Sequence, residues 1–309
     1  MKGFLTRHVS YFGGTTLIEQ IRATAREILE NQTVDLVIGY EAGTRGATRP
    51  AFIYSADEVN RLVWNDACTH NLASYIRDKH VPPKRGAPPA KIGLVLKACD
   101  ARALNVLLRE NQVPRGDLYL IGVVCDGMRQ NAGFAHRPLG DLQPRCQTCT
   151  ERVPLVYDVL VGEIKTWQVS ETRQVWQELE RLEAMTPDER QAFWDAEFAR
   201  CLRCYACRQA CPGCYCVECI AEQLDPEWVG IGIRTPEKRF FHTMRAYHLA
   251  GRCVGCDECA RVCPVGVRLD LLNAWFRREV EQTFGYRAGA DATTPAPLAT
   301  FRPDENLTL

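Results

Sequence analysis

The chain has 309 residues, of which 46% are hydrophobic and 25% charged, as in an ordinary globular protein that buries a sizeable core. Its 38 Lys and Arg balance its 38 Asp and Glu, which argues against nucleic acid as a partner, because phosphate binding needs a basic surplus. No apolar run approaches the roughly 18–20 residues that span a bilayer. The N-terminus also lacks the pattern of a signal peptide, so we expect a cytoplasmic protein without a membrane span.

Residues 1–165 alternate helical and extended patterns. This alternation predicts an α/β domain with a mostly parallel sheet. The expected strands cover 34–40, 51–55, 91–98, 117–125 and 153–162, and the expected helices cover 16–31, 56–64, 71–79 and 99–111.

The pattern changes after residue 165. A helical connector is expected over 166–200, and its second helix has Thr186 as N-cap, Pro187 at the first helical position and Glu189 at the capping-box position. An α-helical, cysteine-rich domain is expected over 201–285, closing with a helix at 269–284. Residues 286–309 are rich in Pro, Ala and Thr and predict an extended tail, which is a candidate docking surface together with the connector helices.

Sixteen cysteines in a cytoplasmic chain of this size indicate metal binding, because disulfides are disfavoured there and not needed. Residues 201–212 and 253–264 repeat the pattern C-x2-C-x2-C-x3-C-P. In that pattern three thiolates bind one 4Fe-4S cluster and the fourth cysteine binds the other. We therefore expect one cluster on Cys201, Cys204, Cys207 and Cys263, and a second on Cys253, Cys256, Cys259 and Cys211. Two zinc sites are the alternative, although zinc usually takes two C-x2-C pairs.

The long segment between the two runs includes a helical stretch at 236–252, so the module resembles the helical ferredoxins of heterodisulfide reductase and succinate dehydrogenase subunits. Arg252 and Arg261 lie beside the cysteines and are expected either to offset cluster charge or to be solvated. His242 and His248 are expected to be packing or surface residues, because six positions apart they do not share a helix face.

A third cysteine group lies in the α/β domain. Cys99 follows one predicted strand, Cys125 ends the next, and Cys146 and Cys149 form a C-x2-C after a loop. The carboxyl ends of parallel strands meet at one sheet edge, so these residues can converge there. On spacing alone a third cluster, a zinc site and ordinary core cysteines all remain open.

Residues 11–165 resemble, in order, the beta subunits of deazaflavin-coenzyme-reducing hydrogenases and formate dehydrogenases. The resemblance rests on "GGTTLIEQIRATAREILENQTVDLVIGY", "KIGLVLKACDARAL", "DLYLIGVVCDGM" and "RCQTCTERVPLVYDVLVGE". It implies a third 4Fe-4S cluster on Cys99, Cys125, Cys146 and Cys149. Leu96 and Ala98 depart from the family signature, which often has Gly and Pro there.

The C-terminal position of the paired motifs resembles another branch of proteins. That branch contains the sulfhydrogenase beta chain, an iron–sulfur component of anaerobic sulfite reductase and the dicluster component of flavin oxidoreductase–heterodisulfide reductase complexes. "CPGCYC" echoes a motif of that branch. The resemblance also implies FAD near the third cluster. Its candidate contacts are Gly13, Gly14, Thr15 and Thr16 before a helix, with Asn71 and Lys97. On spacing alone the Gly-Gly turn is only a helix start.

No acid–base or nucleophilic constellation is apparent, so no catalytic residue is assigned. The resemblance implies an electron-transfer subunit between an NAD(P)H/flavin oxidoreductase, hydrogenase or formate dehydrogenase and a heterodisulfide-reductase-like subunit. A flavin-dependent dehydrogenase acting on a deazaflavin coenzyme and a non-redox zinc scaffold are the alternatives. Cys214, Cys216 and Cys219 either hold a further metal with Cys68 or a partner, or are buried thiols.

Overall fold

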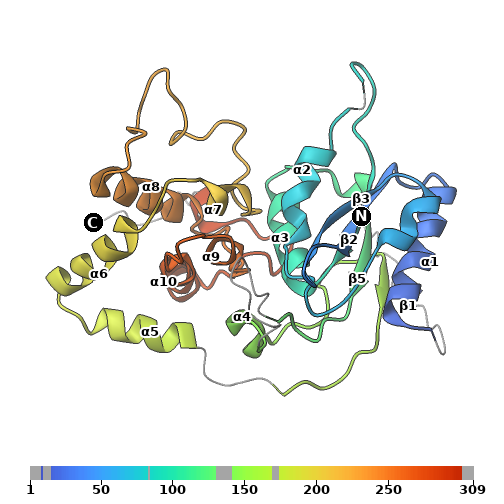
Figure 1. The fold of residues 1–309 in the computed structure, drawn as a ribbon, viewed down its shortest axis with the longest axis horizontal. Coiled ribbons are helices and arrows are strands. Elements are labelled where there is room, and N and C mark those ends of the chain that lie inside the picture. Colours follow the sequence, from blue (N-terminus) through green and yellow to red (C-terminus); the bar gives the residue numbers. More distant parts are fainter. Residues whose placement is uncertain (1–7, 10–14, 83, 130–140, 169–173, 301–309) are drawn as a thin grey trace. The chain divides into compact units, whose positions relative to one another are not determined.

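The computed structural model describes residues 8–9, 15–82, 84–129, 141–168 and 174–300. The chain divides into two compact units, Met1–Arg173 and Gln174–Leu309 (Figure 1). The first unit is an α/β domain with one β-sheet, and the second unit is helical and rich in cysteine. This confirms the predicted fold class. The division falls inside the predicted connector, whose boundaries remain a prediction.

The first unit is built on one six-stranded sheet. Its strands lie in the order β1 (His8–Val9), β6 (Val159–Val161), β5 (Leu118–Val123), β4 (Ile92–Leu96), β2 (Leu36–Ala42) and β3 (Thr48–Ile53). All neighbouring pairs are parallel except β2 and β3. Every residue of β4 is buried, as expected for a parallel strand covered on both faces. The carboxyl ends of β4 and β5 therefore lie side by side at one sheet edge.

Two helices of the first unit match their predictions. They are α1 (Leu17–Glu30) and α3 (Ala98–Arg109), and α2 (Ile76–Lys79) and α4 (Pro144–Gln147) are single turns. The helices expected at 56–64 and 71–79 are confirmed only in part. A 3-10 helix covers Ala56–Arg61, and a 3-10 helix at Leu72–Tyr75 leads into α2. The first of these 3-10 helices ends where Leu62 bridges to Glu41 and the Val63 amide donates to the Tyr40 carbonyl at 2.8 Å. Pairing with β2 thus overrides the helical propensity of this stretch.

The second unit contains helices α5 (Gln174–Glu183), α6 (Pro187–Ala199), α7 (Ala206–Gln209), α8 (Thr235–His248), α9 (Glu258–Arg261) and α10 (Leu269–Phe284). The predicted capping box at Thr186 is confirmed: its hydroxyl accepts from the Glu189 amide at 3.3 Å, and Glu189 accepts from the Thr186 amide at 2.8 Å. The main core joins Phe198 of α6, Phe241 of α8 and Leu269 of α10 to cysteines of both runs.

The first part of the predicted tail packs on the second unit. Tyr286 and Ala296 are buried, and Ala296 and Pro297 lie against Gly251, which follows α8. Residues 301–309 lie outside the described part of the chain. Among the helices that the structure describes, none is both long and apolar enough to cross a bilayer.

Candidate iron–sulfur centres

The two cysteine runs have the same backbone shape. Arg203 and Tyr205 in the first run have φ of 51° and 57°, and Gly255 and Asp257 at the corresponding positions of the second have 69° and 51°. A short helix then follows in each run, α7 or α9. Left-handed backbone costs a residue with a side chain about 1–2 kcal/mol. Such strain is commonly retained where a functional site needs a particular backbone path. The two runs therefore repeat each other in backbone conformation as well as in sequence.

These left-handed turns direct backbone N–H groups at sulfur. The Arg203 amide donates to Cys201 Sγ at 3.2 Å, and the Gly255 amide bonds in the same way to Cys253. Glycine suits the positive φ of Gly255, and an added Cβ would also displace the guanidinium of Arg277. Burial raises the pKa of both first cysteines, and in each run this backbone N–H partly opposes the rise.

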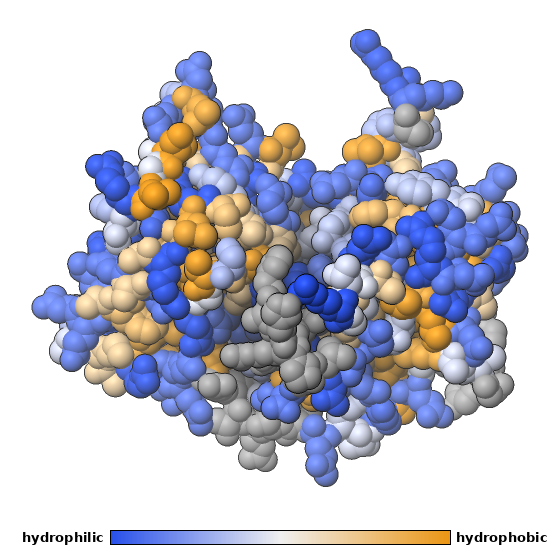
Figure 2. All heavy atoms as spheres, viewed as in Figure 1, coloured by the Kyte–Doolittle hydropathy of each residue, from blue (hydrophilic) through white to orange (hydrophobic). Residues whose placement is uncertain are grey.

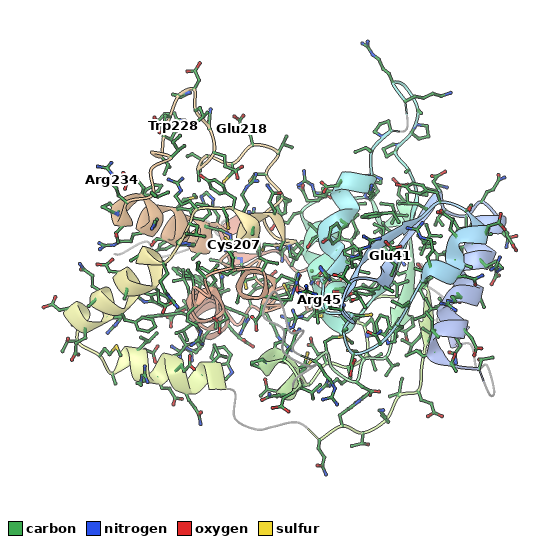
Figure 3. All side chains as sticks on the ribbon, viewed as in Figure 1. Glu41, Arg45, Cys207, Glu218, Trp228 and Arg234 are labelled. Atoms are coloured by element: carbon green, nitrogen blue, oxygen red, sulfur yellow. The ribbon has the colours of Figure 1, made fainter. Side chains whose placement is uncertain are left out.

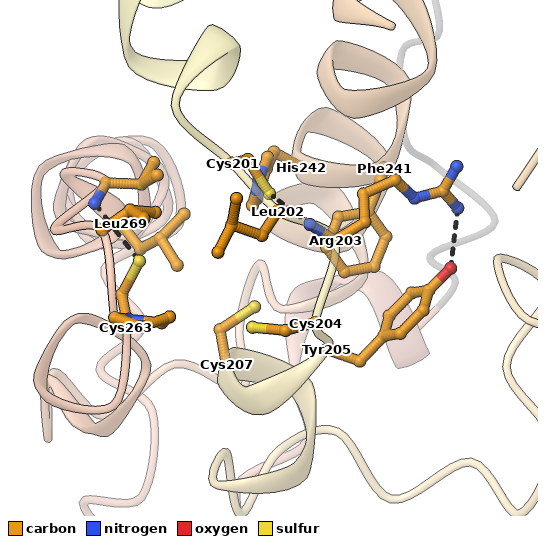
Figure 4. A pocket seen from close by; sticks show the side chains of 13 residues that line it. Cys201, Leu202, Arg203, Cys204, Tyr205, Cys207, Phe241, His242, Cys263 and Leu269 are labelled. Carbon is orange, nitrogen blue, oxygen red and sulfur yellow. Dashed lines mark hydrogen bonds between the residues drawn. The ribbon is translucent and has the colours of Figure 1, made fainter. Parts of the chain in front are cut away.

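One cavity collects four cysteines from both runs (Figure 4). Its volume, including the open mouth, is about 320 Å³. Its cysteines are Cys201, Cys204, Cys207 and Cys263. The rest of the lining is mainly apolar and includes Leu202, Phe241, Pro264, Val265, Val267 and Leu269. The structure thus brings Cys263, which lies 56 positions after Cys207 in the numbering, to the first run's cysteines.

The thiols of this first centre influence one another's ionisation. Burial raises the pKa of Cys207 to about 11, and Cys201 and Cys263 add to the rise. Burial also raises the pKa of Cys201, with Cys263 contributing again. Thiols that suppress one another's ionisation in this way can become thiolates together only when a cation compensates their charge.

The predicted second centre comprises the second run and Cys211. Burial raises the pKa of Cys259, and the neighbouring thiols of Cys211 and Cys253 contribute to the rise. Cys256 is also buried. A side-chain donor already points at this centre, because Asn273 Nδ2 lies 3.6 Å from Cys259 Sγ. Cys263 thus lines the cavity of the first run's cysteines, and Cys211 acts electrostatically on Cys253 and Cys259 of the second run. Crossed ligation of two clusters stays a prediction.

Arg245 on α8 is a buried cation between the two groups of cysteines. Its Nη2 donates to the Cys207 carbonyl at 2.9 Å, and its side chain bonds to the Cys214 thiol. Although burial opposes it, the thiols of Cys214, Cys211, Cys259 and Cys207 hold the pKa of Arg245 well above its ordinary value. The guanidinium of Arg245 can thus compensate negative charge on thiolates of both groups.

The arginines expected beside the thiolates have other contacts. Arg261 forms an ion pair with Glu258 at 2.7 Å, and Arg252 stacks over the ring of Tyr215 at 4.9 Å. Arg245 and His242, which is also buried, were not singled out as site residues from the sequence. Their spacing could have indicated this, because residues three positions apart lie on the same face of a helix, here the amphipathic helix between the two runs.

The third group of cysteines gathers at the carboxyl edge of the sheet. Burial raises the pKa of Cys99 well above its ordinary value and that of Cys125 to about 11, with Cys125 adding to the first shift and Cys146 to the second. Cys149 is likewise affected by burial and by Cys146. Arg152 Nη2 donates a hydrogen bond to the Cys146 carbonyl at 2.7 Å. Each of the four thiols therefore acts electrostatically on at least one other of them. Binding of a cluster by this group stays a prediction.

The candidate flavin contacts fall into two groups. Gly13 and Gly14 lie outside the described residues, and Thr16 caps α1 by donating its amide to Glu19 at 2.7 Å. Asn71 caps a 3-10 turn and donates to the Cys99 carbonyl at 3.3 Å. Lys97 is 1% exposed, and its ammonium contacts Asp100, the His70 carbonyl and the Tyr40 hydroxyl. Asn71 and Lys97 thus border the third cysteine group.

The remaining cysteines do not share one environment. Cys214 is hydrogen-bonded to Cys211, which lowers the pKa of Cys214 and raises that of Cys211. Cys216 is exposed, and its carbonyl accepts from Arg208 at 3.1 Å. Cys68 is buried in the first unit and accepts from the Asn65 amide at 3.4 Å. A further metal site on these residues stays a hypothesis.

The residues of the first centre fit a 4Fe-4S group. Thiolates are its usual ligands, and an apolar shell limits access of water to it. The buried imidazole of His242, which has no hydrogen-bond partner among the described residues, also lines the cavity. Within the described ranges, no three His, Cys, Asp or Glu side chains lie close enough together to hold a single metal ion.

Comparison with known proteins agrees with this chemistry. A family model described as a 4Fe-4S binding domain matches residues 246–268, which contain the second run. The chain is 22% identical to the F420-dependent formate dehydrogenase subunit beta of Methanocaldococcus jannaschii, covering 89% of this chain and 92% of that protein. It is 20% identical to the F420-dependent formate dehydrogenase 1 subunit beta of Methanococcus maripaludis, covering 92% and 94%. The chain is thus a relative, along about nine-tenths of its length, of the beta subunits of F420-dependent formate dehydrogenases, and it carries a 4Fe-4S binding domain.

Proposed function

We propose that this chain is an iron–sulfur electron-transfer subunit of a multi-subunit oxidoreductase. It would relay electrons between a partner that oxidises NAD(P)H, hydrogen or formate and a heterodisulfide-reductase-like or similar acceptor. The observation that carries the proposal is the cavity at which three cysteines of the first run meet Cys263 of the second. Crossed ligation of this kind is the arrangement of two-cluster ferredoxins.

The protein's own groups have definite tasks in this role. The thiolates of the two runs would hold two clusters, and Cys99, Cys125, Cys146 and Cys149 would hold a third. Bound clusters supply one-electron carriers whose potentials depend on charge and hydrogen bonding around them. The buried guanidinium of Arg245 offsets negative charge at both centres of the second unit, and the apolar lining excludes water. FAD beside the third cluster is part of the proposal and rests on family resemblance.

Iron content is the direct test of this assignment. We expect about twelve irons per chain after anaerobic purification or reconstitution, because three cubanes hold four each. The brown colour should bleach with dithionite. Stoichiometric zinc with no bleaching would instead support the zinc scaffold, and about sixteen irons would show that the additional cysteines hold a fourth cluster.

A loop between α7 and α8 supports a role within a larger complex. It exposes several large apolar side chains; the aliphatic ones are among the orange spheres of Figure 2, and Trp228 is labelled in Figure 3. These residues are Val217, Leu224, Trp228, Ile231 and Ile233. Arg203 anchors the loop by donating to the Gly230 and Gly232 carbonyls. The loop is therefore tied to the turn that wraps the first centre, where Cys204 is itself exposed. Exposed apolar clusters commonly mark protein interfaces.

Trp228→Ser is expected to weaken binding of the redox partner at least tenfold, because buried tryptophans often contribute about 2 kcal/mol or more to an interface. Co-purification from the native host, followed by titration of the separated proteins, measures this. Iron content should remain unchanged. Ile164→Ser is the control, since Ile164 is as exposed as Trp228, each at 65%, but belongs to the first unit. Equal weakening by both substitutions would remove the loop from the interface.

The names of the relatives favour a second candidate function, in which this chain itself oxidises or reduces a deazaflavin coenzyme. Under that function the isolated chain, with flavin bound, would reduce a viologen dye with reduced deazaflavin as donor. Activity that requires addition of the partner protein would favour the electron-transfer role.

A further inference from the structure

His242 is a buried polar side chain whose hydrogen-bonding capacity is unused. It is 2% exposed, its ring stacks on Phe198 at 5.0 Å between centroids, and the ring centroid of Phe241 lies 4.9 Å away in an edge-on arrangement. Neither Nδ1 nor Nε2 has a hydrogen-bond partner among the described residues. Leaving a buried donor unpaired costs about 1–3 kcal/mol, so its retention needs a reason.

The surroundings of His242 combine sulfur with cationic donors. The ring lines the cavity that holds the cysteines of the first centre (Figure 4). The charged groups that act on it are Arg245, Arg203 and Lys238, all of which are donors. Lys238 Nζ donates a hydrogen bond to the Ala199 carbonyl at 2.9 Å, and Arg245 Nη2 donates one to the Cys207 carbonyl. The cavity also contains the sulfur atoms of four cysteines, which can accept a hydrogen bond from the imidazole.

The second centre provides a parallel within the same unit. There the buried amide of Asn273 points its Nδ2 at Cys259 Sγ. His242 and Asn273 stand on different helices, α8 and α10, and each is a buried nitrogen donor at one centre. The two runs share their backbone shape, so a side-chain donor at each centre completes the correspondence.

We propose that His242 donates a ring N–H hydrogen bond to a sulfur of the group held by Cys201, Cys204, Cys207 and Cys263, and thereby raises the reduction potential of that group alone. This inference rests on the proposed function. A neutral imidazole carries one N–H and an imidazolium two, so the donor is present in either state. The reduced group is more negative and accepts the bond more strongly, which favours reduction.

The test is an EPR-monitored redox titration of the full, iron-loaded chain with His242→Phe. Phenylalanine keeps the ring stacked on Phe198 and removes only the donor. We expect the potential of one cluster to shift downward while the others keep theirs. The imidazole 14N coupling should disappear from that cluster's pulsed-EPR spectrum, while couplings from backbone amides such as that of Arg203 remain. His248→Phe, on the exposed face of the same helix, should change neither reading. His242→Gln, which restores an N–H donor, should recover part of the shift.

Unchanged potentials in His242→Phe with a full complement of iron would overturn this inference and leave the proposed function standing. A uniform shift of all clusters would overturn it too, because a single hydrogen bond acts on one centre. Loss of the first cluster in both His242 variants would show that the residue holds the group rather than tunes it. Failure of the unsubstituted chain to bind iron would contradict the inference and the proposed function together.

Discussion

Cys263→Ser is expected to remove about four irons per chain and to abolish the EPR signal that Cys204→Ser also abolishes. The reason is geometric, because Cys263 ends the second run in sequence but lines the cavity of the first. Cys211→Ser is expected to do the reverse, removing the signal that depends on Cys256. Serine keeps the size of the side chain and removes the soft thiolate that iron prefers.

Cys216→Ser is the matched control for these substitutions. Cys216 follows the first run closely but is exposed. It should leave both the iron content and the spectra unchanged. If Cys263 and Cys256 were to affect the same signal, each run would hold its own cluster, and the crossed assignment would be wrong. Iron analysis with EPR of the dithionite-reduced variants decides between these outcomes.

Asp100→Asn is expected to destabilise the first unit by about 3–5 kcal/mol, because it leaves the buried ammonium of Lys97 without its counter-charge. Lys97 Nζ lies 3.0 Å from Asp100 Oδ2, with their side chains 2% and 0% exposed. Hydrogen exchange at the amides of β4, in the full chain, measures the free energy of opening. Asp66→Asn breaks the exposed pair with Arg129 and should cost less than about 1 kcal/mol.

The dependence on pH gives this prediction a second signature. Burial by itself lowers the pKa of Lys97, but Asp100 and the neighbouring thiols Cys99 and Cys125 hold it above its ordinary value. Removing the charge of Asp100 leaves burial, which lowers the pKa of Lys97, less strongly opposed. The folded variant therefore binds the Lys97 proton less tightly than the native protein does. The stability lost in Asp100→Asn should therefore diminish as the pH rises toward the ordinary pKa of lysine. The double variant Lys97→Met, Asp100→Asn should recover much of the loss, because no unpaired charge remains.

Features encoded by neighbouring residues were predictable. The helix at 269–284 matches α10 at both ends, and the capping box at Thr186 forms as expected. In both cases periodicity and capping involve residues within one or two turns of each other, so no tertiary contact is needed to recognise them. The helix expected over 56–64 was confirmed only in part, because the conformation there depends on pairing of Leu62 and Val63 with β2, about twenty positions earlier.

The sequence by itself determined the chemistry of this protein. Two cysteine runs of identical spacing predict 4Fe-4S ligation, because the ligand type and the intervals between ligands can be read directly from the chain. The third group of cysteines is assigned to a cluster only by family resemblance, and that assignment stays a prediction. Only the tertiary structure decided what surrounds those sulfurs. It placed Cys263 in the cavity of the first run, Arg245 against both centres and His242 at one of them. These positions depend on how α8 packs between distant segments, and burial and charge compensation of that kind are not local properties of a sequence.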